Sequence, residues 1–291
     1  IYNWARERLT EPEQRWWLSC TMAVLALCIS PNLEASGQKF RRLLLPHMDS
    51  CIRALKLQCP SYPDSVERAA EIEKFAWVYA ENGLWSTART LQSKVIQFRV
   101  KHLGKRHEAT ILAQRSLGYT YWNLFEIRPA IGVQTQVLSS LWWVRPSLVY
   151  WTVWPPWKPD HVPYCIGLGD LTLTLWLAGK REWSKYVGER AVNGLLKRLG
   201  PEDPKTLTAM FNLARTHLHL GNYEKSRELL VWVLKRRKRL FGLDHPETLM
   251  ARNELGILLC AQRQHLAVAE RLVANVLESR KRILGEEHAY T

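Results

Sequence analysis

Apolar residues recur every three or four positions along most of this 291-residue chain, which is the pattern of amphipathic helices. In one clear segment that begins near Thr206, the recurring apolar residues are Leu207, Met210, Leu213, Ala214 and Leu218. Gly221 and Asn222 follow, and glycine commonly ends a helix because it adopts the left-handed conformation without strain. The pattern therefore predicts a helix from about residue 206 to a turn at Gly221.

A second helix is predicted directly after that turn. Its inward-facing residues are expected to be Tyr223, Ser226, Leu230, Val233 and Leu234. Gly242 ends this helix, and a short loop leads to Pro246, which is tolerated in the first turn of a helix because no amide donor is needed there. The unit of structure is thus expected to be a pair of helices.

One phrase marks the start of each pair. It is written LGPEDPKT at 199–206, FGLDHPET at 241–248 and LGEEHAYT at 284–291. The cap position of this phrase, just before the helix, holds His107, His161, Asp203, His245 and His288, at intervals of 54, 42, 42 and 43 residues. Because these histidines recur with the repeat, we interpret them as structural turn residues and not as catalytic ones.

A second series of positions gives the same period. The turn position inside each pair holds Gly83, Phe125, Gly179 and Gly221, at intervals of 42, 54 and 42 residues. Repeats of this length are typical of stacked helical pairs, since one pair cannot bury its apolar face alone. The sequence therefore predicts an all-α array with a period of about 42 residues.

The repeated phrases resemble the tetratricopeptide repeats of the kinesin light chain type. The resemblance covers Ser65 to the end of the chain and is carried by LGPEDPKTL, NLA, LGNYEKS and RKRLFGLDHPETL. It implies a right-handed superhelical solenoid of antiparallel two-helix repeats. Two departures occur: Glu254 replaces Asn212 of the Asn-Leu-Ala triplet, and Phe125 or Gln264 replaces the turn glycine.

The N-terminal segment resembles a different element. YNWARERLTEPEQRWW, Tyr2 to Trp17, is similar to the Trp-Ala-Arg segment that follows the nucleotide-binding and winged-helix modules of fungal NLR-like (NB-ARC) proteins. FRRLLLPHMDSCIRAL, Phe40 to Leu55, looks like the second helix of the divergent pair found there. The resemblance implies that this sequence is a piece of a longer protein, with an NTPase upstream and more repeats downstream.

These patterns predict two regions. Residues 1–60 form a divergent helical segment, and residues 61–291 form the array. Its units are expected near 65–106, 107–160, 161–202, 203–244 and 245–287. The second unit contains a Trp- and Pro-rich insertion at 139–159, whose prolines exclude a continuous helix. Partner binding through exposed tryptophans, stacking on single-stranded bases, a loop folded over the array and a retained intron are all compatible with it.

The chemistry of the chain does not point to an enzyme. No P-loop and no complete dinucleotide fingerprint occurs, and no convergent acid, base, nucleophile or metal-ligand set is recognisable. We therefore expect no catalytic residue, no cofactor and no metal site. The six cysteines form no Cys-x-x-Cys pair, so we interpret them as reduced core thiols of a cytoplasmic protein.

The formal net charge of +14 permits nucleic acid, acidic peptides or a membrane surface as partners. The basic run 235–239 lies near the end of a predicted helix, where cations oppose the negative end of the helix dipole. Similar basic residues follow at 280–282 and precede at 197–198, so a structural role explains the repetition. A nuclear-localisation signal or a nucleic-acid patch is the alternative, and no membrane span is predicted.

The first helix of each pair is expected to line a concave groove. Positions six, nine and thirteen after the Thr that follows the cap position should face it. These groove candidates are Lys74, Trp77 and Glu81 in the first unit, Ser116, Tyr119 and Asn123 in the second, and Asn212, Arg215 and His219 in the fourth. Their mixture of polar, cationic and aromatic side chains suits a protein or peptide ligand.

The leading hypothesis is a non-catalytic interaction scaffold, the ligand-sensing part of a fungal NLR-like protein that assembles through an upstream domain. A cargo adaptor like kinesin light chain is the alternative, and a nucleic-acid-binding array is less favoured. An upstream P-loop would support the first hypothesis, and an upstream heptad coiled coil the second.

Overall fold

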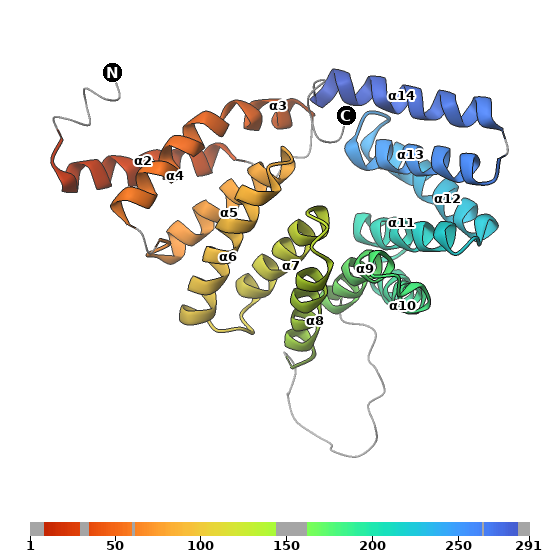
Figure 1. Cartoon of the computed structure of the whole chain (residues 1–291), viewed down its shortest axis with the longest axis horizontal. Helices are drawn as coiled ribbons and strands as arrows, with labels where there is room; N and C mark the ends of the chain where they lie inside the picture. Colours follow the sequence, from red (N-terminus) through yellow and green to blue (C-terminus); the bar gives the residue numbers. More distant parts are fainter. Residues whose placement is uncertain (1–8, 30–34, 60–61, 144–161, 264, 285–291) are drawn as a thin grey trace, which may run out of the picture. The chain divides into compact units, whose positions relative to one another are not determined.

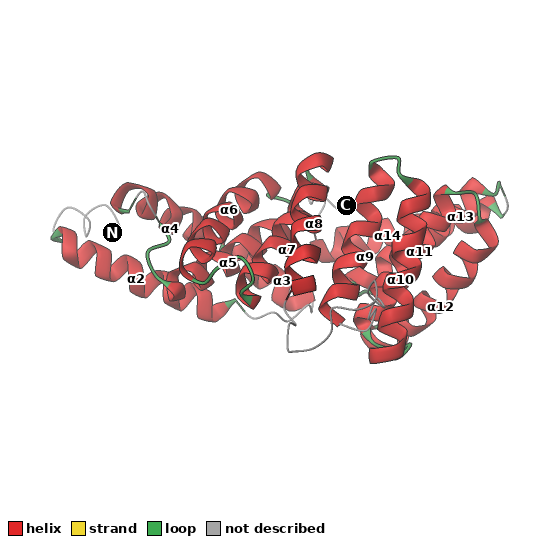
Figure 2. Cartoon of the chain, turned by 90° about the horizontal axis from the view of Figure 1, so that it is seen from below, coloured by secondary structure: helices red, strands yellow, loops and turns green. Residues whose placement is uncertain are grey.

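The computed structural model describes residues 9–29, 35–59, 62–143, 162–263 and 265–284. Over these ranges every regular element is a helix, and Figure 2 shows helices joined by loops without a strand. The chain divides into two compact units, Ile1–Gly104 (unit 1) and Lys105–Thr291 (unit 2). The all-helical prediction is confirmed, whereas the predicted boundary at residue 60 stays a prediction.

Unit 2 consists of helices that pack in consecutive pairs (Figure 1). We call the first helix of each pair the A helix and the second the B helix. The A helices are α7 (Glu108–Asn123), α9 (Val162–Leu177), α11 (Pro204–His219) and α13 (Pro246–Ala261). The B helices are α8 (Ile127–Trp143), α10 (Arg181–Leu199), α12 (Tyr223–Phe241) and α14 (Leu266–Leu284).

Unit 1 contains one further pair and a less regular N-terminal part. The pair is α5 (Val66–Glu81) and α6 (Trp85–His102), and the other helices are α2 (Glu11–Cys28), α3 (Ala35–Leu43) and α4 (Leu45–Gln58). The expected single helix Phe40–Leu55 is wrong, because the chain breaks at Leu44 between α3 and α4. Pro46 stands at the start of α4, and its ring clashes with a continuing helix. The start of the Tyr2–Trp17 segment lies outside the described residues.

The cap position explains why one phrase recurs. The Nδ1 atoms of His107 and His245 accept hydrogen bonds from the backbone N–H groups of Ala109 and Glu247, each at 3.2 Å. Asp203 does the same for Lys205 at 2.8 Å. Such bonds satisfy a backbone donor that has no partner inside the helix. The structural interpretation of these residues is confirmed; His161 and His288 lie outside the described residues.

The turn position adopts the left-handed conformation in every described pair. The φ angles are 77° at Gly83, 73° at Gly179 and 78° at Gly221, and the non-glycine Phe125 has a φ of 58°. In the last pair Arg263 adopts this conformation, with a φ of 51°. The expected replacement of the turn glycine by Gln264 falls outside the described residues, and the interval of 42 residues from Gly221 identifies Arg263 instead.

Replacing Phe125 by glycine should stabilise unit 2. Phe125 is 77% exposed, so little packing is lost, while the left-handed conformation costs an L-residue about 1–2 kcal/mol. Glycine also has more freedom in the unfolded chain, which offsets part of this effect. The net gain in the free energy of unfolding should be about 0.5–1 kcal/mol. Urea unfolding measures it. The reverse change, Gly221→Phe, should destabilise, although open space surrounds Gly221. A loss of stability in Phe125→Gly, or no loss in Gly221→Phe, would contradict strain at this turn.

Part of the Trp- and Pro-rich insertion is helical. The B helix α8 continues to Trp143, so the expected loop at 139–159 begins later than predicted. No proline occurs from 139 to 143, which removes the reason for an earlier break. The remainder, residues 144–161, lies outside the described residues.

The cysteines only partly fit the predicted core role. All six are free, and Cys51 and Cys165 are buried. Burial raises the pKa of the Cys51 thiol to about 11. Cys28 and Cys260 are exposed, so the interpretation of these two as core thiols is wrong. Both lie on solvent-exposed faces of their helices, which the spacing along the sequence does not reveal.

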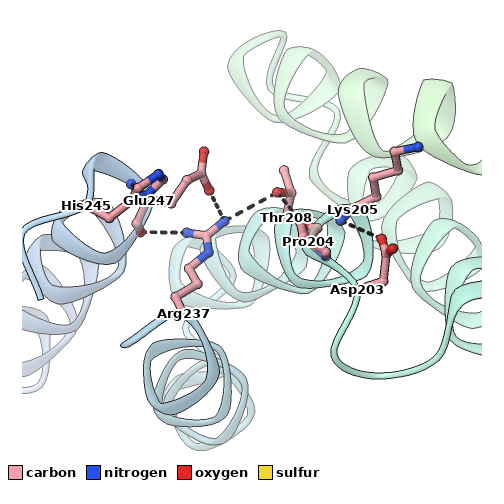
Figure 3. Close-up of polar contacts among 7 residues, drawn as sticks. All are labelled: Asp203, Pro204, Lys205, Thr208, Arg237, His245 and Glu247. Carbon is pink, nitrogen blue, oxygen red and sulfur yellow. Dashed lines mark hydrogen bonds and ion pairs between the residues drawn. The ribbon is translucent and has the colours of Figure 1, made fainter. Parts of the chain in front are cut away.

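The basic run 235–239 contains a buried arginine that joins two repeats (Figure 3). Arg237 on α12 is 1% exposed. Its guanidinium donates to the Glu247 carbonyl oxygen at 2.9 Å, pairs with the Glu247 carboxylate, and reaches Thr208 Oγ1 at 3.4 Å. From the B helix α12, Arg237 therefore links the A helix of the same pair, α11, to the A helix of the next pair, α13. Burial lowers the pKa of Arg237 and Glu247 opposes that shift.

This arginine recurs in unit 1. Arg99 follows its turn glycine by the same interval and is 5% exposed. It donates two hydrogen bonds of 2.9 Å to the carboxylate of Glu73. The prediction that the basic run mainly compensates the helix dipole is thus incomplete, because the arginine at this repeat position carries a buried contact.

Candidate functional site

The A helices of unit 2 form a continuous row. Helix α9 contacts α7 and α11, and α11 also contacts α13. Three polar contacts cross from one A helix to the next. Arg115 Nε lies 2.9 Å from Asp170 Oδ2, Asn212 Nδ2 donates to the Gly169 carbonyl at 3.2 Å, and Arg215 Nε lies 3.4 Å from Glu254 Oε1.

These contacts depend on the repeat. Asp170, Asn212 and Glu254 occupy one position, six residues after the Thr position of their units. Asn212 is only 7% exposed, so the predicted groove residue acts as a tie between α9 and α11. Burial raises the pKa of Asp170 and of Glu254, while the paired arginine opposes the shift in each case. Each carboxylate at this position is paired with an arginine of the preceding A helix.

Aromatic side chains gather around Arg215. Its Cζ atom lies 5.9 Å from the ring centroid of Trp122, 5.8 Å from that of Trp176 and 6.0 Å from that of Phe211. His219 stacks on Trp176 with ring centroids 4.2 Å apart. We call Trp122, Trp176, Phe211, Arg215, His219 and Glu254 the Arg215 cluster. It brings together residues from all four A helices of unit 2.

The electrostatics of this cluster favour a neutral His219. Burial lowers the pKa of His219, and the positive charges of Arg215 and Arg181 lower it further. The cluster thus holds one arginine, one carboxylate and several rings. The guanidinium carries five N–H donors, enough to hold Glu254 and a ligand carbonyl or carboxylate at the same time. The rings supply faces on which apolar or cationic ligand groups can pack.

One of the predicted residues of α7, Tyr119, contacts this cluster. Ser116 and Tyr119 are exposed, and Asn123 Nδ2 donates to the Tyr119 carbonyl at 2.9 Å. The Tyr119 ring stacks on Trp122 at 5.9 Å. The indole N–H of Trp122 is shielded from solvent and has no acceptor among the described residues. Tyr119 therefore extends the cluster along α7.

The predicted residues of the first unit lie on α5 and belong to unit 1. Lys74, Trp77 and Glu81 each contact the N-terminal helices α2 or α3 of that unit. The contacts described for these three side chains all lie within unit 1.

Some residues of the cluster were not predicted. Trp122 and Trp176 both lie twelve positions after the Thr position of their units, a coincidence that was visible in the sequence. Glu254 was noticed only as a departure from the triplet. Glu254 lies six residues after the Thr position of its unit, and Arg215 lies nine residues after the Thr position of the previous unit. A carboxylate and an arginine at these two positions of consecutive units are the signal that predicts the pair.

The described residues show no metal-binding chemistry and no bilayer-spanning helix. No group of three or more His, Cys, Asp or Glu side chains comes together there as a metal site. No helix in the same ranges is both long and apolar enough to cross a bilayer.

Comparison with known proteins identifies the repeat. The family model described as tetratricopeptide repeat matches residues 206–247 and 248–290, so the chain carries tetratricopeptide repeats there. The search of curated proteins found no match. The two matched segments coincide with α11–α12 and α13–α14, which contain Arg215, His219 and Glu254.

Solved structures show the same fold over most of the chain. The nearly identical TPR-like repeats of a putative kinesin light chain from Podosopora anserina share 20% identity, with 75% of this chain and 98% of that chain covered and a TM-score of 0.52. BtubC (BKLC) from P. vanneervenii shares 15% identity, with 93% of each chain covered and a TM-score of 0.54. A Rap protein complexed with Competence and Sporulation Factor shares 15% identity, with 84% of this chain and 66% of that chain covered and a TM-score of 0.52.

Residues 206–290 therefore carry tetratricopeptide repeats, and the chain has a helical solenoid fold like that of kinesin light chain arrays. Stacked repeats of this kind form extended concave surfaces, but the fold alone does not fix the function, which lies in the sites that it carries. The matches indicate no enzyme family.

Proposed function

We propose that unit 2 binds a protein or peptide ligand through the face formed by its A helices, and that the chain is a non-catalytic interaction scaffold. The Arg215 cluster carries this proposal. It joins a guanidinium, a carboxylate and aromatic rings from four helices on one face. An extended peptide needs donors and acceptors for its backbone and ring faces for its side chains, and this cluster offers both.

The similar Rap structure supports the choice of a protein or peptide ligand, since that array was solved with a bound factor. Nucleic acid is less favoured by the contacts of the basic run. Arg237 is buried, Arg239 pairs with Glu202, and Arg236 stacks over Trp232 at 3.2 Å. These engaged arginines leave a weaker positive patch than the sequence suggests, and nucleic-acid affinity depends on cations that reach phosphates.

For the parent protein, we propose a fungal NLR-like (NB-ARC) context in the cytoplasm. The Trp-Ala-Arg segment near Trp4 and the repeats that follow it support this context. In such a protein the array senses a ligand, and an upstream nucleotide switch responds by assembly. Nucleotide binding by the parent that changes when the ligand is added would support this role, and a parent without nucleotide affinity would contradict it.

A kinesin-light-chain-like cargo adaptor is the second candidate, because the P. anserina repeats share the fold over nearly their whole length. A heptad coiled coil in the parent, with co-purification of a motor subunit, would favour this candidate over the first.

The binding face is tested by substitutions on α11. The immobilised chain is used to capture partners, which are identified and then measured one at a time by calorimetry. Arg215→Ala combined with His219→Ala should weaken binding at least tenfold, because both side chains lie in the cluster. Trp183→Ala combined with Tyr186→Ala on the B helix α10 is the control, since both residues are exposed there. Equal loss in the two variants, or no loss in either, would contradict the proposal.

A further inference from the structure

Helix α5 of unit 1 carries its groove-position residues against the N-terminal helices of its own unit. Lys74 Nζ donates to the Ala26 carbonyl of α2 at 2.8 Å. Ala26 lies in the last turn of α2, where carbonyl groups lack partners within the helix. Lys74 thus caps α2. The remaining two residues, Trp77 and Glu81, both contact the same side chain of α3.

That side chain is Arg41. Its Nε donates to Glu81 Oε2 at 2.8 Å and its second terminal nitrogen donates to Glu81 Oε1 at 2.6 Å. The Arg41 Cζ atom also lies 4.8 Å from the Trp77 ring centroid. The Arg41 side chain is 2% exposed and that of Glu81 12% exposed. A bidentate hydrogen bond to a carboxylate, combined with stacking on an aromatic ring, suits the planar guanidinium of arginine and not the ammonium group of lysine.

Helix α3 brings little else to this contact. Among its described side chains, from Gly37 to Leu43, Arg41 is the only buried one. Phe40 is 47% exposed and Leu43 is 71% exposed. The helix has nine residues, fewer than a helix needs for stability by itself in water. The position of α3 on unit 1 therefore depends strongly on the site that receives Arg41.

We propose that Trp77 and Glu81 form an arginine-binding site on α5, that Arg41 fills this site from within the chain, and that an arginine side chain of a partner peptide can take its place. The two residues stand at the repeat positions that supply Tyr119 and Asn123 on α7 and Arg215 and His219 on α11. The site thus uses the positions at which we expect the repeat to face a ligand. The inference extends the proposed function but rests on contacts in unit 1 alone.

The first test empties the site in the full chain. Arg41→Ala should bind the peptide acetyl-Gly-Arg-Gly-amide at least tenfold more tightly than the unaltered chain, as measured by calorimetry. The matching lysine and citrulline peptides should bind at least tenfold more weakly than the arginine peptide. Adding Glu81→Gln should abolish the binding. Arg42→Ala is the control, because Arg42 is an exposed neighbour on the same helix and its replacement should leave binding as in the unaltered chain.

A second measurement uses the unaltered chain and does not depend on the folding of the variant. Saturating arginine peptide should speed amide hydrogen exchange in residues 35–43 at least fivefold, because α3 loses its anchor, while the citrulline peptide should not. Unchanged exchange, or a folded Arg41→Ala chain that does not prefer the arginine peptide, would overturn the proposal. Arg215→Ala should leave both results intact, so failure here is distinguishable from failure of the binding face in unit 2.

Discussion

Replacing Arg237 by alanine should lower the free energy of unfolding of unit 2 by about 2–3 kcal/mol. Removing one partner of a fully buried ion pair costs about 3–5 kcal/mol, because the other charge stays buried without compensation. The Glu247 side chain is 35% exposed, so water screens part of that cost. The variant also loses the hydrogen bonds to the Glu247 carbonyl and to Thr208. Urea unfolding followed by circular dichroism gives the difference.

Arg239→Ala is the matched control for Arg237→Ala, two residues further along the same helix. Arg239 pairs with Glu202, but their side chains are 62% and 49% exposed. Exposed pairs contribute roughly 0–1 kcal/mol. A similar loss in both variants would show that the junction between α12 and α13 does not depend on the buried guanidinium.

Replacing Leu230 by alanine should cost about 2–5 kcal/mol, the range for leucine in a well-packed interior. Leu230 is fully buried in α12, in a core that also contains Leu207 of α11 and Ala251 of α13. The leucine is thus enclosed by the A helix of its own pair and by the A helix of the next one. Thermal and urea unfolding measure the loss.

Val273→Ala provides the comparison within the repeat. Val273 lies seven residues after the start of α14, as Leu230 does after the start of α12. It is 37% exposed, because no A helix is described on that side of α14. Its replacement should cost less than about 1 kcal/mol, since fewer buried methyl groups are lost. Costs of equal size in the two variants would show that the following A helix adds nothing to the core.

The features that depend on local sequence were predicted well. The cap and turn positions follow from short-range hydrogen bonds and from backbone sterics, so two series of single residues were enough to give the period and the helical pairs. The break between α3 and α4 was missed because the helix Phe40–Leu55 was inferred from a resemblance, which does not take account of Pro46 in this chain.

The contacts between helices were harder to predict. Arg41, Arg99 and Arg237 are buried, although arginine in a basic segment normally indicates a solvated face. Each is buried because a carboxylate from another helix meets it, and such partners are set by packing between helices that are 10 to 40 residues apart in the chain. The Arg215 cluster was found in part, through Arg215 and His219. The groove residues as a set stay a prediction.

The stacking of the helical pairs in unit 2 also affects how rapidly this unit folds. Its principal contacts join helices that are next, or next but one, along the chain. Chains rich in such short-range contacts close small loops and reach the native state quickly, and folding in repeat arrays starts at any unit and spreads to its neighbours. During synthesis, each pair can thus acquire its structure soon after it leaves the ribosome, before the residues that follow it have been made.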